Sequence, residues 1–281
     1  SLVPRLSSSP QRGEGDPAQD ADTGSYGVGR PIDPPRAPGW KVGLRDCHCA
    51  SPEVAPSVQG EVEKALRLAL HQQKVNAVGC GRTDTGVHAS HYWLHFDAPS
   101  DRRLDDRFMH SLNGILPESI AVMRIVSVPD DAHARFSATE RGYVYRIHQL
   151  KDPFLTERSH LLKPALDVDA MNEACACLIG QQDFSSFQRV GSDNRTSICD
   201  VRHARWEHTG NGYRFSIRAD RFLRNMVRAI VGTCIVVGKG QQPPAHMREV
   251  LLAHDRSKAG KSAPARGLYL DHVVYPFIPG T

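Results

Sequence analysis

The spacing of the hydrophobic residues changes several times along this chain, and these changes constrain its fold more than any single motif. At 142–148 and 213–219, apolar residues occupy every second position, which is the pattern of strands. At 168–179 they recur every three or four positions, which is the pattern of a helix. Because strand-rich and helical segments follow one another twice in the same order, the sequence predicts an α+β fold with two similar halves and mixed sheets.

The expected elements fall into two structured parts. The first part, 38–130, should hold a helix from Val58 capped by Ser57, strands at 74–79, 91–96 and 120–128, and a helix near 108–112. The second part, 131–281, should hold strands at 142–148, 198–206, 213–219 and 268–275, with helices at 168–179 and 221–237. Residues 1–37 are rich in Pro and Gly and poor in aliphatic residues, so we expect a disordered or atypical extension there.

The composition is that of an ordinary soluble protein. Hydrophobic residues make up 40% of the 281 residues, and no apolar run approaches the roughly 18 residues of a membrane helix. The N-terminus shows no secretory pattern. The seven cysteines form no CxxC pair, and neither Cys47-His48-Cys49 nor Cys175-Ala176-Cys177 has a second pair to complete a metal site. We therefore expect a cytoplasmic protein with reduced thiols, no metal and no membrane contact.

Positive charge is concentrated in one stretch of the chain. Between 202 and 228, seven arginines accompany only Glu207 and Asp220, a local excess of five positive charges. The planar guanidinium group suits phosphate recognition. On charge alone, a nucleic-acid-binding surface and a solvated basic face are equally good interpretations.

Asp84 lies at the tip of a glycine-rich loop, 79–88, that follows a predicted buried strand. Glycines let such a loop turn sharply and approach a ligand, and Arg82 lies two residues before Asp84. An arginine near a carboxylate favours the ionised form that a nucleophile needs. The alternative interpretation is a hairpin loop with a surface Arg–Asp pair.

Two tyrosines share one face of the strand predicted at 142–148. Tyr143 and Tyr145 alternate with Val144, and Arg146 points to the opposite face. An aromatic ring beside positive charge can stack on a base, a contact worth roughly 1–3 kcal/mol. Either ring can instead belong to the core.

The helix predicted at 221–237 combines an apolar side with arginines. Arg221, Arg224 and Arg228 fall at positions i, i+3 and i+7, so they would form one stripe opposite the apolar side. Such a stripe can lie along a phosphate backbone, or offer one arginine to an acid across a cleft. It can also be a solvated face.

Two short motifs suggest other chemistries and fail. Asp84-Thr85-Gly86 matches aspartic proteases, but these need two carboxylates that share a proton, and a nearby arginine opposes protonation. Gly260-Lys261-Ser262 ends like a P-loop, yet Asp255 stands where the first glycine is required. The sequence thus favours neither a protease nor a P-loop nucleotide site.

Five blocks in order resemble the TruA-type tRNA pseudouridine synthases, over about four-fifths of the chain. They are Gly81-Arg82-Thr83-Asp84-Thr85-Gly86-Val87-His88-Ala89, residues 128–139 leading into the tyrosine strand, Asp183-Phe184-Ser185-Ser186-Phe187, Asn225-Met226-Val227-Arg228 with Ile230-Val231-Gly232, and Gly267-Leu268-Tyr269-Leu270. By position, the resemblance makes Asp84 the nucleophile, Arg82 an RNA-handling or base-flipping residue, Tyr143 the ring on the target base, Arg228 the ion-pair partner of Asp84, and Leu268 a pocket residue. Arg221 and Arg224 are expected to bind substrate alongside them.

The resemblance also implies an architecture and a reaction. It implies two ferredoxin- or RRM-like halves that form a mixed, mostly antiparallel central sheet, with helices on one side and an RNA-binding cleft on the other. The implied reaction isomerises uridine in the tRNA anticodon arm, positions 38 to 40, on a flipped base and without cofactor or metal. The implied assembly is a homodimer whose subunits both hold the tRNA.

The N-terminal segment departs from the family pattern. Only Gly39-Trp40 and Ser57-Val58-Gln59 match the family's opening segments, and no convincing strand precedes Gly39. The first half of the sheet is therefore expected to lack a strand beside the Asp84 loop. This leaves a second hypothesis, a catalytically impaired RNA-binding relative with a defective N-terminal sheet. Retention of Asp84, Tyr143 and Arg228 together favours the enzyme.

Overall fold

The computed structural model describes residues 39–45, 57–192 and 195–280 of the chain. The expected extension 1–37 and the segment Cys47-His48-Cys49 lie outside the described residues. Within them the chain forms an α+β fold whose strands are mixed and mostly antiparallel, as the periodicity predicted. None of the described helices is long and apolar enough to cross a lipid bilayer.

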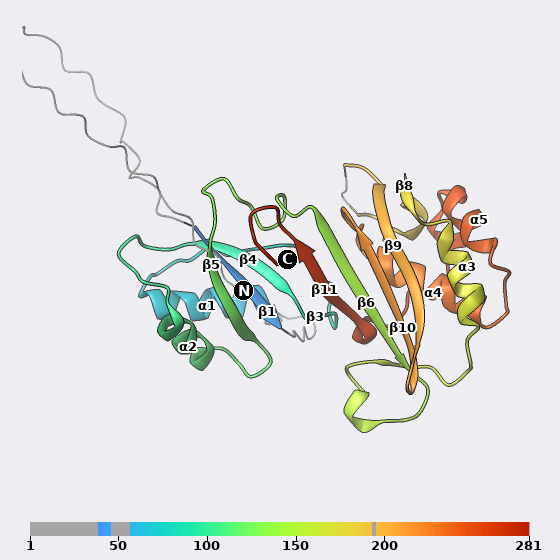
Figure 1. The fold of residues 1–281 in the computed structure, drawn as a ribbon, viewed down its shortest axis with the longest axis horizontal. Helices are drawn as coiled ribbons and strands as arrows, with labels where there is room; N and C mark the ends of the chain where they lie inside the picture. The colour runs from blue at the N-terminus through green and yellow to red at the C-terminus, as the bar shows by residue number, and fades with distance from the viewer. Residues whose placement is uncertain (1–38, 46–56, 193–194, 281) are drawn as a thin grey trace, which may run out of the picture.

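The first sheet has the strand order β2-β4-β1-β5 and is antiparallel throughout. Its strands are β1 (Gly39–Arg45), β2 (Val78–Gly79), β4 (Tyr92–Asp97) and β5 (Ala121–Ser127). Helices α1 (Val58–Leu70) and α2 (Asp106–Ile115) pack on this sheet and share one hydrophobic core with it (Figure 1). Ser57 caps α1 as predicted, since its hydroxyl accepts a hydrogen bond from the amide of Gly60 at 3.1 Å.

Two predictions for the first sheet need correction. The prediction that the first sheet lacks a strand is wrong, because β1 lies between β4 and β5 and pairs with β5 from Trp40 to Arg45. The strand was not predicted because Gly43 interrupts the alternation of Trp40, Val42 and Leu44 with polar residues. The pairing register with β5 shifts between Gly43 and Leu44. The strand expected at 74–79 is reduced to β2, because the amide of Ala77 bonds to the carboxylate of Glu63 on α1 at 3.1 Å instead of to a strand.

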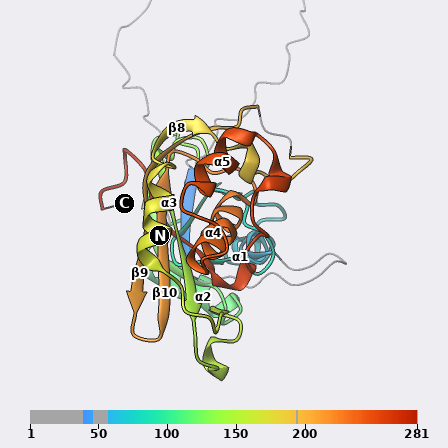
Figure 2. The same ribbon diagram turned by 90° about the vertical axis from the view of Figure 1, so that its right-hand side faces the viewer.

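The second sheet has the order β3-β11-β6-β10-β9-β8, with β7 beside β6. Its strands are β3 (His88–Ala89), β6 (Glu140–His148), β7 (His160–Leu161), β8 (Gly180–Asp183), β9 (Ile198–Thr209), β10 (Gly212–Ala219) and β11 (Leu268–Val274). Only β3 and β7 pair in parallel; the other neighbours are antiparallel. Helices α3 (Val168–Ala176), α4 (Met226–Gly238) and α5 (His246–Ala253) cover one face of this sheet (Figure 2).

The loop that contains Asp84 connects the two sheets. The strand before it, β2, belongs to the first sheet, and the strand after it, β3, pairs with β11 in the second sheet. The amide of Cys80 also bonds to the carbonyl of Trp93 on β4 at 2.7 Å. Both ends of the loop are therefore fixed, and Asp84 lies where the two sheets meet.

The helix predicted at 221–237 is shorter than expected. It begins at Met226, because Asn225 adopts a left-handed backbone with φ of 68°, and the amide of Arg221 bonds to the carboxylate of Asp220 at 2.7 Å. The prediction of a stripe of three arginines on this helix is therefore wrong. Arg221 and Arg224 precede α4, and Arg228 is the only charged residue of α4.

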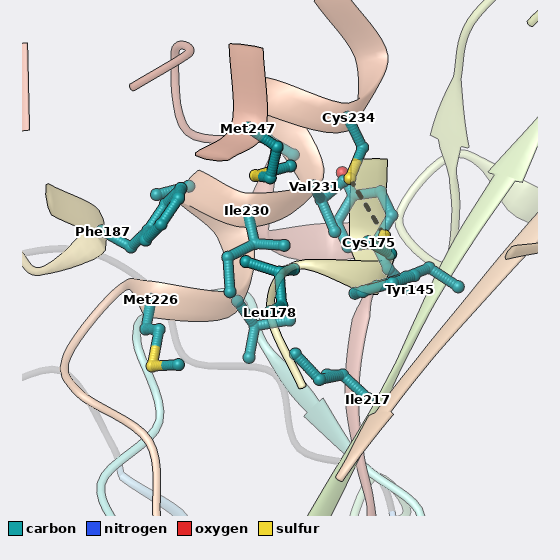
Figure 3. Packing of buried hydrophobic residues seen from close by; sticks show 14 of the residues in the cluster. Tyr145, Cys175, Leu178, Phe187, Ile217, Met226, Ile230, Val231, Cys234 and Met247 are labelled. Atoms are coloured by element: carbon teal, nitrogen blue, oxygen red, sulfur yellow. Dashed lines mark hydrogen bonds between the residues drawn. The ribbon is translucent and has the colours of Figure 1, made fainter. Parts of the chain in front are cut away.

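Helix α4 is central to the second core. Eleven of its 13 residues are buried, among them Met226, Ile230 and Val231, which lie among residues of α3, α5 and β10 (Figure 3). The thiols of Cys175 and Cys234 face each other between α3 and α4, with their sulfur atoms 3.6 Å apart. A helix this enclosed can hold a side chain at its surface in a fixed position.

The close contact between α4 and the segment 260–263 predicts a large effect of a small substitution. A Cβ atom at Gly232 would lie 1.9 Å from the carbonyl oxygen of Lys261. We expect Gly232→Ala to lower the free energy of unfolding by about 3 kcal/mol, measured by urea denaturation, because both contacting groups are backbone. Gly114→Ala on α2, where a Cβ meets nothing within 4 Å, should be neutral or stabilising by about 0.5 kcal/mol. Equal effects of the two substitutions would contradict the packing argument.

Candidate active site

The Asp84 loop is shaped by a turn and by its neighbours. The amide of Val87 bonds to the carbonyl of Asp84 at 3.1 Å, and Gly86 between them adopts a φ of 79°. Only glycine adopts this left-handed backbone without strain, which explains the glycine at this position. The turn leaves the Asp84 side chain partly buried, with 22% of it exposed.

Two guanidinium groups flank the carboxylate of Asp84. Arg228 donates a hydrogen bond from Nη1 to Oδ2 at 3.0 Å, and Nε of Arg224 lies 3.6 Å from Oδ1. Arg228 is as buried as Asp84, with 21% of its side chain exposed, whereas 57% of Arg224 is exposed. The two guanidinium groups therefore place positive charge beside both oxygens of the only carboxylate in this loop.

Arg228 is itself held in place by the backbone. Its Nε donates to the carbonyl of Ala263 at 2.7 Å, and its own carbonyl accepts from the amide of Ala263 at 2.9 Å. Asn225 Nδ2 donates to Ser262 Oγ at 2.7 Å, which ties the start of α4 to the same segment. The Gly260-Lys261-Ser262 sequence therefore supports α4, and it leaves Arg228 one orientation toward Asp84.

Aromatic and apolar side chains lie in the same part of the molecule, and Tyr143 is near enough to Asp84 for the charge of Asp84 to affect its pKa. Tyr143 makes an edge-to-face contact with Phe222 at 5.1 Å between ring centroids. Leu268 is buried opposite Tyr145 on the neighbouring strand, in the same core as α4. Burial raises the pKa of Tyr143, the nearby Cys80 and Asp84 add to the rise, and Arg141 opposes it. The Tyr143 phenol therefore stays protonated at neutral pH and cannot serve as a base.

Comparisons with known proteins identify the family of this chain. A model of the tRNA pseudouridine synthase family matches residues 174–276. A tRNA pseudouridine synthase A of Parabacteroides distasonis is 46% identical over 222 residues, covering 78% of this chain and 87% of that protein. The tRNA pseudouridine synthases A of Porphyromonas gingivalis and Paraburkholderia phymatum are 46% and 39% identical, over 89% and 88% of their lengths. The chain belongs to the tRNA pseudouridine synthase A family.

Membership in the tRNA pseudouridine synthase A family confirms the resemblance seen in the five sequence blocks. The chain is therefore an enzyme of the isomerase class. The family match favours this interpretation over the two structural alternatives, a solvated basic face and a simple hairpin loop. The match extends over 78% of the chain, and so includes both sheets rather than the C-terminal part alone.

Within this family framework, the structure brings together some predicted site residues and not others. Asp84 lies with Arg228, Arg224 and Tyr143, as described above. Arg82 is exposed and forms no ion pair with any residue in the described ranges. Arg221 lies close enough to the thiol of Cys199 to lower its pKa against the effect of burial, and it makes no ion pair with Asp84.

Two of these residues lie on the same side of the second sheet. Arg228 is on α4, and Leu268 belongs to the core formed with α3, α4 and α5. The candidate site therefore lies on the helix-bearing side of the second sheet.

Sequence reasoning missed Arg141, a residue that connects the segments on either side of the candidate site. Its Nη1 donates to the carbonyl of Asp220 at 3.0 Å and its Nη2 to the carbonyl of Cys80 at 3.3 Å, with further bonds to Ala138 and Arg135. It thus joins the start of the Asp84 loop to the segment before α4. The only signal in the sequence was a position at the start of the tyrosine strand, which does not reveal backbone partners.

Proposed function

We propose that this enzyme isomerises uridine to pseudouridine in the anticodon arm of tRNA, at positions 38 to 40, with Asp84 as its nucleophile. One observation carries the proposal: a partly buried carboxylate, bonded to the fixed guanidinium of Arg228, lies beside the Tyr143 ring. The anticodon-arm positions come from the family resemblance.

The reaction needs one nucleophile and a pocket for a flipped base. Flipping a uridine out of the RNA costs a few kcal/mol of stacking energy. Asp84 then attacks C6 of the uracil or C1′ of the ribose, and the bond between N1 and C1′ breaks. The base rotates, C5 bonds to C1′, the C5 proton leaves, N1 gains a proton and Asp84 is released. Atoms and electrons balance without an oxidant or a hydrolytic water.

The neighbouring residues have separate roles in this proposal. Arg228 orients Asp84 and stabilises its charge, and Tyr143 packs on the uracil while Leu268 forms part of an apolar wall. The exposed Arg224 and Arg82 face the RNA backbone near the flipped nucleotide. Arg221 makes no ion pair with Asp84, and we propose that it binds a phosphate farther from the base.

We further propose that the two sheets are the two ferredoxin-like halves, 38–130 and 131–281, with the RNA between their helix layers. Helices α1, α2, α4 and α5 lie on the same side of the strands in Figure 2, and the Asp84 loop connects the two sheets. The family resemblance adds a homodimer, which sedimentation velocity tests directly: a monomer at micromolar concentration would contradict it.

The second hypothesis, an impaired RNA-binding relative, loses its structural basis. That hypothesis required a defective N-terminal sheet, yet β1 completes a four-stranded sheet that includes β2, the strand before the Asp84 loop. No other feature of the described residues favours it.

The proposed substrate is tested by mapping pseudouridine in an unmodified tRNA transcript after incubation with the enzyme. We expect modification at positions 38 to 40 and nowhere else in the transcript. Pseudouridine confined to another arm would contradict the assignment of the anticodon arm but not the family.

Substitution of Tyr143 separates stacking from hydroxyl chemistry. Tyr143→Ala removes a ring whose stacking is worth roughly 1–3 kcal/mol, so kcat/KM should fall by about 10- to 100-fold. Tyr143→Phe keeps the ring and should retain most of this stacking, losing only the steps that use the hydroxyl. Single-turnover rates on tRNA measure both, and equal losses in the two variants would contradict a stacking role.

A further inference from the structure

The face of the second sheet that lies opposite α3, α4 and α5 carries an unusual set of charges. Strand register places Arg146 of β6, Arg214 and Arg218 of β10, and Arg205 of β9 on this face. We call these four residues the arginine face. All four are exposed. Two acids share this face of the sheet: Glu207, which stands opposite Arg214 on β9, and Glu140 of β6, which is paired with Arg202.

The arginines are not neutralised within the protein. None of the four forms an ion pair with another residue in the described part of the chain, whereas neighbouring Arg202 is paired with Glu140 and Asp200. The guanidinium of Arg146 instead lies 4.1 Å above the ring of Tyr269, which fixes its position. Their charge is therefore available to a ligand.

The register also places like charges next to one another. Arg146 and Arg214 stand directly opposite each other on adjacent antiparallel strands, where like charges destabilise a sheet. Farther along, Arg218 stands opposite His203. Burial lowers the pKa of His203, and the charges of Arg218 and Arg205 lower it further, against the opposing effects of Glu207 and Glu140. Both observations indicate a positive potential that an anionic partner would relieve.

The basic surface continues to the edge of the molecule. Strand β8 pairs with β9 only as far as Val201, and beyond it a groove of about 420 Å3 opens between β9 and α3. Arg205 of the arginine face lines this groove, together with Arg202, whose charge is paired with Glu140 and Asp200. Three adjacent strands at about 4.8 Å spacing give the arginine face a width of roughly 10 Å, enough for several phosphates of one backbone.

We propose that the arginine face binds the sugar–phosphate backbone of tRNA outside the anticodon arm. The proposal rests on the proposed function for its ligand, and on charge complementarity for the site. Asp84 pairs with Arg228 of α4, a helix on the opposite face of this sheet, so we expect that the arm that delivers the uridine does not also cover the arginine face. A second copy of the chain fits less well, because a two-fold interface would set these arginines against themselves.

The double variant Arg146→Gln/Arg214→Gln tests this proposal in the full chain. With a full-length tRNA transcript, we expect Kd to rise on the order of tenfold and the slope of log K against log salt to fall by about 2. With a hairpin of the anticodon arm alone, Kd should not change. The variant should fold at least as well as wild type, since it removes a like-charge contact, and thermal unfolding checks this.

The control is Arg248→Gln/Lys258→Gln, which removes the same charge from exposed positions on α5 and the turn after it. It should leave the Kd of both RNAs unchanged. Equal losses in the two double variants, or equal losses for tRNA and hairpin, would overturn the proposal, as would an unchanged tRNA Kd with an altered oligomeric state. Hairpin isomerisation by the wild type tests the proposed function separately, because the binding comparison does not depend on turnover.

Discussion

Replacing Asp84 by asparagine is expected to abolish pseudouridine formation, with a loss in kcat of more than about 10⁴-fold. The substitution keeps the shape of the side chain and removes the charge that would attack the base. The Kd for tRNA should stay the same or decrease slightly, because a negative charge leaves a site that faces RNA phosphates. Single-turnover assays and a binding titration on the same tRNA measure the two effects.

The control for this experiment is Asp101→Asn, at an exposed position in the loop after β4. It removes one carboxylate without touching the site and should keep wild-type turnover. If Asp84→Asn retained turnover within tenfold of wild type, the nucleophile would be another group. If it lost tRNA binding and turnover together, Asp84 would be structural.

Replacing Arg228 by glutamine is expected to give the second largest loss. It removes the hydrogen bond to Asp84 at 3.0 Å and the bond to the carbonyl of Ala263 at 2.7 Å. Loss of such an oriented charge partner typically lowers kcat by about 10²- to 10³-fold, equivalent to about 3–4 kcal/mol. The loss should appear mainly in kcat, because Arg228 contacts Asp84 rather than the RNA backbone.

Arg224→Gln is the matched comparison, since it removes the other guanidinium beside Asp84. Arg224 is 3.6 Å from the carboxylate and largely exposed, so solvent screens its charge. We expect it to lower kcat less than tenfold and to raise KM, as a residue near the RNA backbone would. A larger effect on kcat from Arg224 than from Arg228 would reverse the proposed roles.

Local sequence patterns predicted the helices and strands that bury one face against the core. The alternation at 142–148 and the Ser57 cap both gave the observed strand and helix, since each depends on neighbours in sequence. The pairing of Asp84 with Arg228 came from the family resemblance and is seen at hydrogen-bond distance. Spacing alone could not have paired residues 144 positions apart.

The features that the sequence did not predict depend on contacts between distant segments. The start of α4 was placed too early because nothing local shows that Asn225 takes a left-handed backbone and that Asn225 bonds to Ser262. Arg141 was missed because its partners are backbone carbonyls, which any sequence provides. The arginine face was not predicted either, because it depends on the register of β6, β10 and β9. This register brings Arg146, Arg205, Arg214 and Arg218 together on one face.

Tritium release from tRNA labelled at C5 of uridine is the most direct test of Asp84 as the nucleophile. Joining C5 to C1′ displaces the hydrogen at C5, so the wild-type enzyme should release one tritium for each pseudouridine formed. Asp84→Asn should bind the same labelled tRNA and release none above background. Tritium release by that variant at a rate near wild type would contradict the assignment of the reacting carboxylate.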